Sequence, residues 1–105
     1  MARAKSMVYV LATTDFKFVK IGSTISPKMR FNNIQTACPY ELFLWNGVRT
    51  LRIKEIESEL HEQFSEWRFR GEWFCLPGKQ LDLLSNRIAE LNEMERRGCT
   101  TTSET

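Results

Sequence analysis

The chain has 105 residues, of which 42% are hydrophobic and 11% aromatic, and it carries a formal net charge of +2. This length and composition predict one folded domain with a single core, and they exclude a disordered chain. No apolar run approaches the roughly 18 residues of a membrane span, and the short apolar run near the N-terminus does not fit a signal peptide, so we expect a cytoplasmic protein without a membrane partner.

Charge is distributed unevenly along the chain. Residues 1–54 hold 9 lysines and arginines against 2 acidic residues, whereas residues 55–105 hold 6 against 11. A basic half of this kind is what a polyanion such as DNA would bind. The alternative is that the two halves only complement each other.

The first elements in chain order are two strands and a helix. Met7 to Ala12 and Phe16 to Ile21 are rich in β-branched and apolar residues, and the polar residues between them suit a tight turn, so we predict an antiparallel hairpin. Gly22 is expected to end the second strand. Ser26-Pro27 is a helix-start signal, and the helix is predicted to run to about Gln35 or Thr36.

The later elements are a third strand over 41–48, a helix over about 51–67, a short strand or anchor over 73–76 and a last helix over about 78–96. Gly98 is expected to stop that helix and to begin a disordered tail over 98–105. We therefore predict an α/β (α+β) fold with a small, three-stranded, mostly antiparallel sheet flanked by helices. A single domain is expected over 1–97, with its motifs between residues 7 and 76.

Glu57 is the sharpest candidate for a functional residue. The apolar stripe of its helix contains Ile53, Ile56, Leu60 and Phe64, and Glu57 falls inside that stripe. A carboxylate on a buried face is costly unless it is paired or bound to a cation. Two interpretations stay open: a salt bridge at the edge of the core, or a ligand for Mg²⁺.

Four further residues are candidates for phosphate chemistry. His61 lies one helical turn after Glu57 and has either a structural role or one in phosphate binding or proton transfer. Arg30 is either solvated or a clamp for a phosphate. Tyr9 is a core residue or a reactive phenol, and Lys20 on the paired strand would lower its pKa if the two share a face.

The same basic half supplies candidates for nucleic-acid contacts. Lysines offer positive charge, and backbone near a glycine can approach a phosphate closely. The candidates are Lys17, Lys28, Gly22, Ser23 and Thr24.

Short motifs occur in order along two-thirds of the chain. Val8-Tyr9 comes first, Lys20-Ile21-Gly22 follows, and Arg30 lies eight positions after the glycine. The remaining motifs are Gln35 to Pro39 (QTACP), Glu57 to His61 (ESELH) and Gly71 to Phe74 (GEWF). Together they resemble the GIY-YIG nuclease superfamily, and within it the phage and bacterial branch of the meiotically up-regulated gene 113 type, in which KIG replaces YIG.

This resemblance implies a metal-dependent DNA endonuclease that uses one Mg²⁺ or Mn²⁺ ion. It implies that Tyr9 helps to activate the attacking water, that Arg30 steadies the scissile phosphate and that Glu57 holds the metal. Lys20 and His61 would support them as further catalytic residues. Lys20 departs from the family pattern, because it stands where the motif has its second tyrosine.

Two other functions stay open. One is a non-catalytic nucleic-acid-binding module on the same fold. The other is a small interaction or structural protein that docks a partner, or a second copy of itself, through the last helix. Three sources of substrate preference also stay open: a separate targeting partner, a DNA structure or a homodimer.

Overall fold

The structure, a computed structural model, describes residues 5–104, with side chains described as far as residue 97. Five antiparallel strands form one sheet in the order β3-β1-β2-β5-β4. The strands are β1 (Ser6–Thr13), β2 (Val19–Thr24), β3 (Leu42–Thr50), β4 (Arg68–Arg70) and β5 (Trp73–Phe74). The helices are α1 (Pro27–Thr36), α2 (Ile53–Gln63), the short 3₁₀ helix η1 (Ser65–Trp67) and α3 (Gly78–Glu104).

The predicted fold class is confirmed, but the sheet has five strands rather than three. The sequence pattern missed β4 because it is too short, at three residues, for alternation to be recognised. Gly71, with φ of 57°, supplies the left-handed turn that folds β4 back onto β5. β2 also extends to Thr24, so Gly22 lies inside the strand and does not end it.

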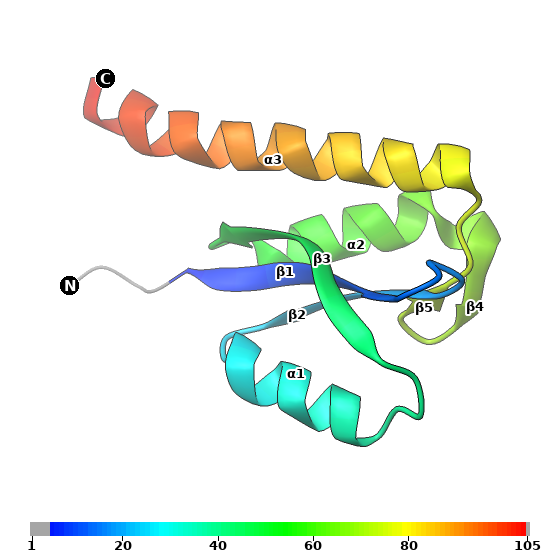
Figure 1. Ribbon diagram of the computed structural model, residues 1–105. Helices are drawn as coiled ribbons and strands as arrows, with labels where there is room; N and C mark the ends of the chain where they lie inside the picture. Colours follow the sequence, from blue (N-terminus) through cyan, green and yellow to red (C-terminus); the bar gives the residue numbers. More distant parts are fainter. Residues whose placement is uncertain (1–4, 105) are drawn as a thin grey trace.

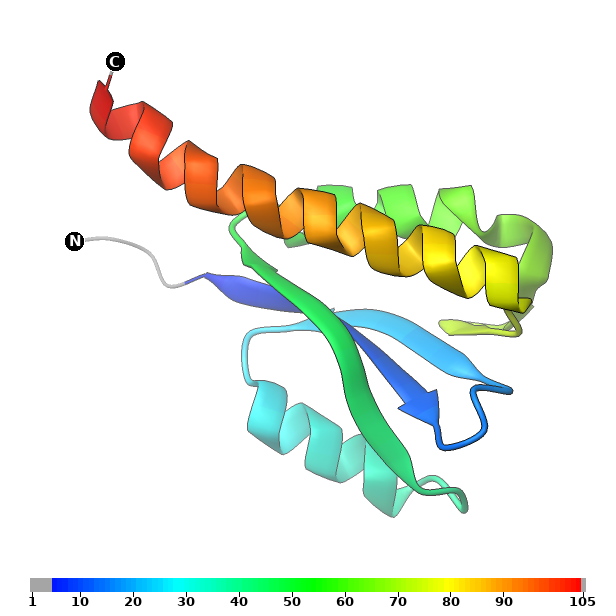
Figure 2. The same ribbon diagram turned by 45° about the horizontal axis from the view of Figure 1, so that its top comes forward.

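Helices cover both faces of the sheet, as Figure 1 and the turned view in Figure 2 show. α2 and α3 lie on one face, where the larger core cluster forms around Val10, Ile21, Leu60 and Ile88. α1 lies on the other face, where Phe31 and Ile34 pack against a smaller cluster of Met7, Tyr9 and Leu11. Because side chains alternate along a strand, neighbours in β1 serve both clusters.

The last helix continues past its predicted end, and its apolar stripe lies in the core. Leu84, Ile88 and Leu91 are at most 2% exposed and face the sheet, so the apolar stripe is core and is not available to dock a partner. α3 continues through Gly98 to Glu104, past the predicted end near residue 96. One glycine disfavours a helix by only about 1 kcal/mol, which neighbouring turns can offset. The prediction of a disordered tail over 98–105 falls on residues whose side chains lie outside the described residues.

None of the described helices combines the length and the apolar character that crossing a membrane requires.

Candidate functional site

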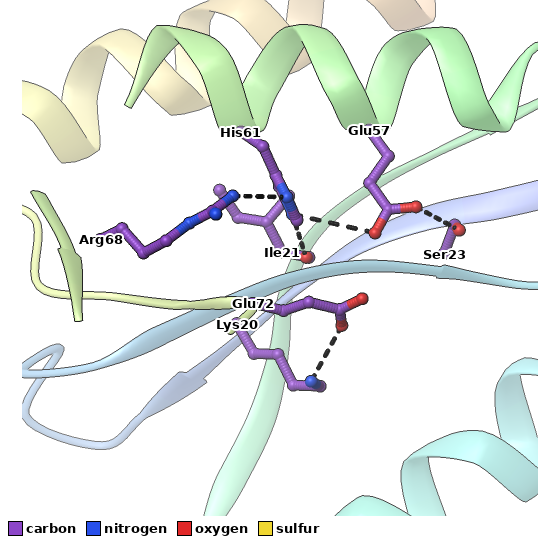
Figure 3. Close-up of polar contacts among 7 residues, drawn as sticks. All are labelled: Lys20, Ile21, Ser23, Glu57, His61, Arg68 and Glu72. Carbon is purple, nitrogen blue, oxygen red and sulfur yellow. Dashed lines mark hydrogen bonds and ion pairs between the residues drawn. The ribbon is translucent and has the colours of Figure 1, made fainter. Parts of the chain in front are cut away.

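The candidate residues gather where the sheet has an open edge. Among the described residues, β5 pairs with β2 at Val19 and Lys20 only, and no other strand lies along the rest of β2 on that side. Two contacts continue the edge at Ile21, whose backbone N–H donates to the carbonyl oxygen of Glu72 at 3.0 Å and whose carbonyl oxygen accepts from His61 Nε2 at 2.8 Å. Side chains from both faces of the sheet therefore reach the same place (Figure 3).

Glu57 points from α2 toward the end of β2. Its Oε1 accepts a hydrogen bond of 2.6 Å from the Ser23 hydroxyl, and its Oε2 lies 3.8 Å from His61 Nε2. The side chain is 20% exposed, so it sits at the rim of the core rather than inside it. Among the described residues no lysine or arginine pairs with Glu57, so a salt bridge to such a residue does not explain its position.

The hydrogen bonds of His61 define its tautomer. Nε2 contacts the carbonyl oxygen of Ile21, which can only accept, so Nε2 carries the hydrogen and donates. Nδ1 lies 3.0 Å from Nη2 of Arg68, which can only donate, so Nδ1 is the acceptor. His61 is thus neutral in this arrangement, and both of its nitrogens are engaged in holding α2 and β4 to the edge of β2.

Lys20 is paired with Glu72, on the other side of β2 from Glu57 and His61 (Figure 3). Lys20 Nζ donates to Glu72 Oε1 at 2.9 Å and also lies 5.5 Å from the centre of the Trp73 ring. Burial disfavours the charged form of Glu72, but the hydrogen bond and charge of Lys20 outweigh it and hold the pKa of the Glu72 carboxyl below its ordinary value. Glu72 is therefore ionised at neutral pH.

Tyr9 is fully buried, and its hydroxyl lies beneath Gly22. A Cβ placed on Gly22 would lie 2.5 Å from the Tyr9 hydroxyl oxygen and 2.8 Å from Glu72 Oε1, so only glycine leaves room for both. The hydroxyl has no well-formed hydrogen bond among the described residues, although the Arg30 guanidinium lies close enough to interact with it. Burial raises the pKa of the phenol, although the nearby Arg30 guanidinium opposes this shift.

Arg30 reaches this cluster from the other side, since it projects from α1 and is exposed. The structure thus brings together Tyr9, Lys20, Arg30, Glu57 and His61, with Gly22 and Ser23 beside them. Thr24 serves locally, accepting a hydrogen bond from the backbone N–H of Ser26. Lys17 lies in the β1–β2 turn and Lys28 lines a different groove with Leu11 and Phe43, so the cluster includes neither.

The sequence interpretation missed two members of the cluster, Glu72 and Arg68. Glu72 had a recognisable signal: it is a carboxylate directly before the apolar pair Trp73-Phe74, of which Phe74 is fully buried, so its side chain had to lie near the core. Arg68 had none, because its contact with His61 depends on β4, a strand that the pattern did not reveal.

The donor set suits a hard divalent cation. No three histidine, cysteine, aspartate or glutamate side chains form a metal cage within the described residues. Mg²⁺ does not need one, because it binds through one or two carboxylates and completes its shell with water and substrate phosphate. The carboxylates of Glu57 and Glu72 lie close enough to interact, and the buried hydroxyl of Tyr9 adds a third oxygen near Glu72.

The comparison with protein families gives one match. The T5orf172 domain matches residues 6–95, which is most of the chain. No curated protein and no solved structure matches it. T5orf172 domains are nuclease-like, DNA-binding modules, and the match supports a function at that level.

This match corrects the family named from the motifs, since T5orf172 is a different family and the assignment to the GIY-YIG superfamily is wrong. The motifs are two to five residues long, and several of their residues have packing roles here. Gly22 makes room for Tyr9, and Phe74 is fully buried. Such short motifs do not separate two families that place similar residues on similar elements. The chain belongs to the T5orf172 domain family.

Proposed function

We propose that this domain hydrolyses phosphodiester bonds in DNA with the help of one divalent metal ion, Mg²⁺ or Mn²⁺. The observation that carries the proposal is the convergence of two carboxylates, two cations and a buried phenol at the open edge of β2. Structural ion pairs also occur at sheet edges, but they do not require a fully buried phenol whose hydroxyl has no well-formed hydrogen bond.

The cations would bind the substrate. Arg30 presents an exposed guanidinium that can donate two parallel hydrogen bonds to a phosphate. Lys20, with 13% of its side chain exposed, adds a second positive charge on the floor of the site. The attraction of both side chains to the phosphate would strengthen as negative charge builds on it in the transition state.

Tyr9 and Glu72 are the candidates for proton transfer. Because burial raises the pKa of Tyr9 above 10, fewer than about one phenol in a thousand is ionised at pH 7. Tyr9 would therefore hold the attacking water as a neutral phenol. As that water loses its proton to the phenol oxygen, the phenol would pass its own proton to the ionised Glu72 on the other side of Gly22.

Glu57 is the candidate for holding the metal, since Glu72 is paired with Lys20 and takes the proton in this scheme. Ser23 fixes the orientation of the Glu57 carboxylate through Oε1 and leaves Oε2 facing the site. A divalent ion bound there would supply positive charge to the leaving oxygen.

The second candidate function is nucleic-acid binding without cleavage. Two observations favour it: Tyr9 is 0% exposed, and Lys20 is already paired with Glu72. A reacting phenol must come within hydrogen-bond distance of water, so catalysis would require the Gly22 backbone above it to admit that water.

Cleavage of supercoiled plasmid by the purified protein in Mg²⁺, Mn²⁺ or EDTA tests the proposal. We expect nicking with either metal and none in EDTA. Glu57→Gln should lower the rate by roughly 100-fold or more, since a metal contributes several kcal/mol to such a reaction. Glu62→Gln, the same change on the exposed side of α2, is the matched control and should be neutral. Intact DNA binding with no cleavage in any metal would favour the second function.

A further inference from the structure

A groove of about 530 Å³ adjoins the candidate site, between α1 and the β4–β5 hairpin. Lys20 and Arg30, which belong to the site, also line this groove, so the two are continuous. The volume falls within the roughly 300–1,000 Å³ that is usual for pockets that take small groups, and it is far too small for a duplex.

The charge of the groove is of one sign. Three cations line it, Lys20 and Arg30 together with Arg70 of β4, and none of the described residues that line it is acidic. The surroundings suit a negatively charged backbone, which would pass along these three side chains toward the open edge of β2.

Aromatic rings form much of the rest of the wall. Phe69 on β4 and Tyr40 after α1 are 63% and 61% exposed, although both are large rings that a fold would ordinarily cover. Phe69 is supported from behind by Phe18, whose ring centre lies 5.3 Å away. Trp73 lines the same groove beneath Lys20 Nζ.

We propose that this groove binds an unpaired nucleobase next to the phosphate to be cut, so that the substrate is DNA with a single-stranded or splayed nucleotide at the cleavage position. A base inside a duplex has both faces covered by its neighbours, whereas an unpaired base can stack on an exposed ring. Rings beside cations are the arrangement that binds single strands without reading their sequence. The placement of this base next to the scissile phosphate rests on the nuclease function proposed above.

Fluorescence anisotropy tests the groove without requiring cleavage. The probes are a single-stranded oligonucleotide, its duplex, and the same strand with abasic positions, each titrated with the wild-type protein in EDTA. We expect the single strand to bind more tightly than the duplex, and the abasic strand to bind about 5- to 100-fold more weakly than the intact strand, as loss of one stacked base predicts.

Phe69→Ala should weaken single-strand binding by the same factor and leave abasic binding unchanged. Phe43→Ala removes a half-exposed ring outside the groove and is the matched control. Equal binding of intact and abasic strands, or no effect of Phe69→Ala, would overturn the groove proposal. The two proposals fail separately: base-dependent binding without metal-dependent nicking rejects only the nuclease, and nicking without base dependence rejects only the groove.

Discussion

Tyr9 and Gly22 lie opposite each other in the β1–β2 ladder, and the Tyr9 hydroxyl fills the space that a side chain at Gly22 would need. The hydroxyl carbon of the ring would lie only 2.7 Å from such a Cβ. Gly22 is therefore required by a close approach inside a regular strand and not by an unusual backbone angle.

Gly22→Ala tests this relationship. The added methyl must displace the Tyr9 ring, which sits against Phe31 with ring centres 5.1 Å apart and has little room to move. We expect the free energy of unfolding to fall by about 1–3 kcal/mol, as overpacking of a core does. Denaturant unfolding measures it. Gly78→Ala, where a Cβ would meet no atom within 4 Å, is the control, and equal stability of the two variants would contradict the packing described.

Tyr9→Phe separates stability from function. The buried hydroxyl has no well-formed hydrogen bond among the described residues, although the exposed Arg30 guanidinium lies close to it. The removed desolvation penalty and the lost contact with Arg30 oppose each other, so we expect the free energy of unfolding to change by less than about 1 kcal/mol while cleavage is lost. The exposed Tyr40 is the control: Tyr40→Phe should change stability by less than about 0.5 kcal/mol. A Tyr9→Phe protein destabilised by more than about 1 kcal/mol would indicate that the hydroxyl has a structural partner.

Much of the fold could be predicted from the sequence because it depends on local patterns. Residues close together in sequence determine the hairpin, the start of α1 at Pro27 and the apolar stripe of α2. The pairing of Lys20 with Glu72 joins residues 52 positions apart, which no local pattern contains, and β4 is too short for a pattern to reveal. The position of Glu57 at the rim of the core followed from helical spacing, but its partner Ser23 required the sheet register.

We expect Glu72→Gln to lower the free energy of unfolding by an amount that depends on pH. The pKa of Glu72 is lower in the folded protein than its ordinary 4.5, because Lys20 stabilises the carboxylate. A lowered pKa means that the stabilisation is fully present above about pH 4.5 and is lost as the pH falls through the folded value. Glu72→Gln should therefore unfold more easily than the wild type at pH 7, and the difference should vanish at the acid end. Thermal melts from pH 7 downward measure it, and a difference that grows toward acid would contradict the sign.

His61 provides a prediction that needs no mutation of a catalytic group. Its Nε2 should carry the hydrogen, because Nε2 faces the Ile21 carbonyl and Nδ1 faces the Arg68 guanidinium. Long-range ¹H–¹⁵N NMR of the imidazole distinguishes the two tautomers, and a hydrogen on Nδ1 would refute the arrangement.

His61→Ala should lower the free energy of unfolding by about 1–3 kcal/mol, since the Ile21 carbonyl then loses its partner. Arg68→Ala should have a smaller effect on stability, because its side chain is exposed, yet it should free the ring of His61 to exchange tautomers. A larger loss for Arg68→Ala than for His61→Ala would mean that β4, rather than the histidine, holds this edge of the sheet.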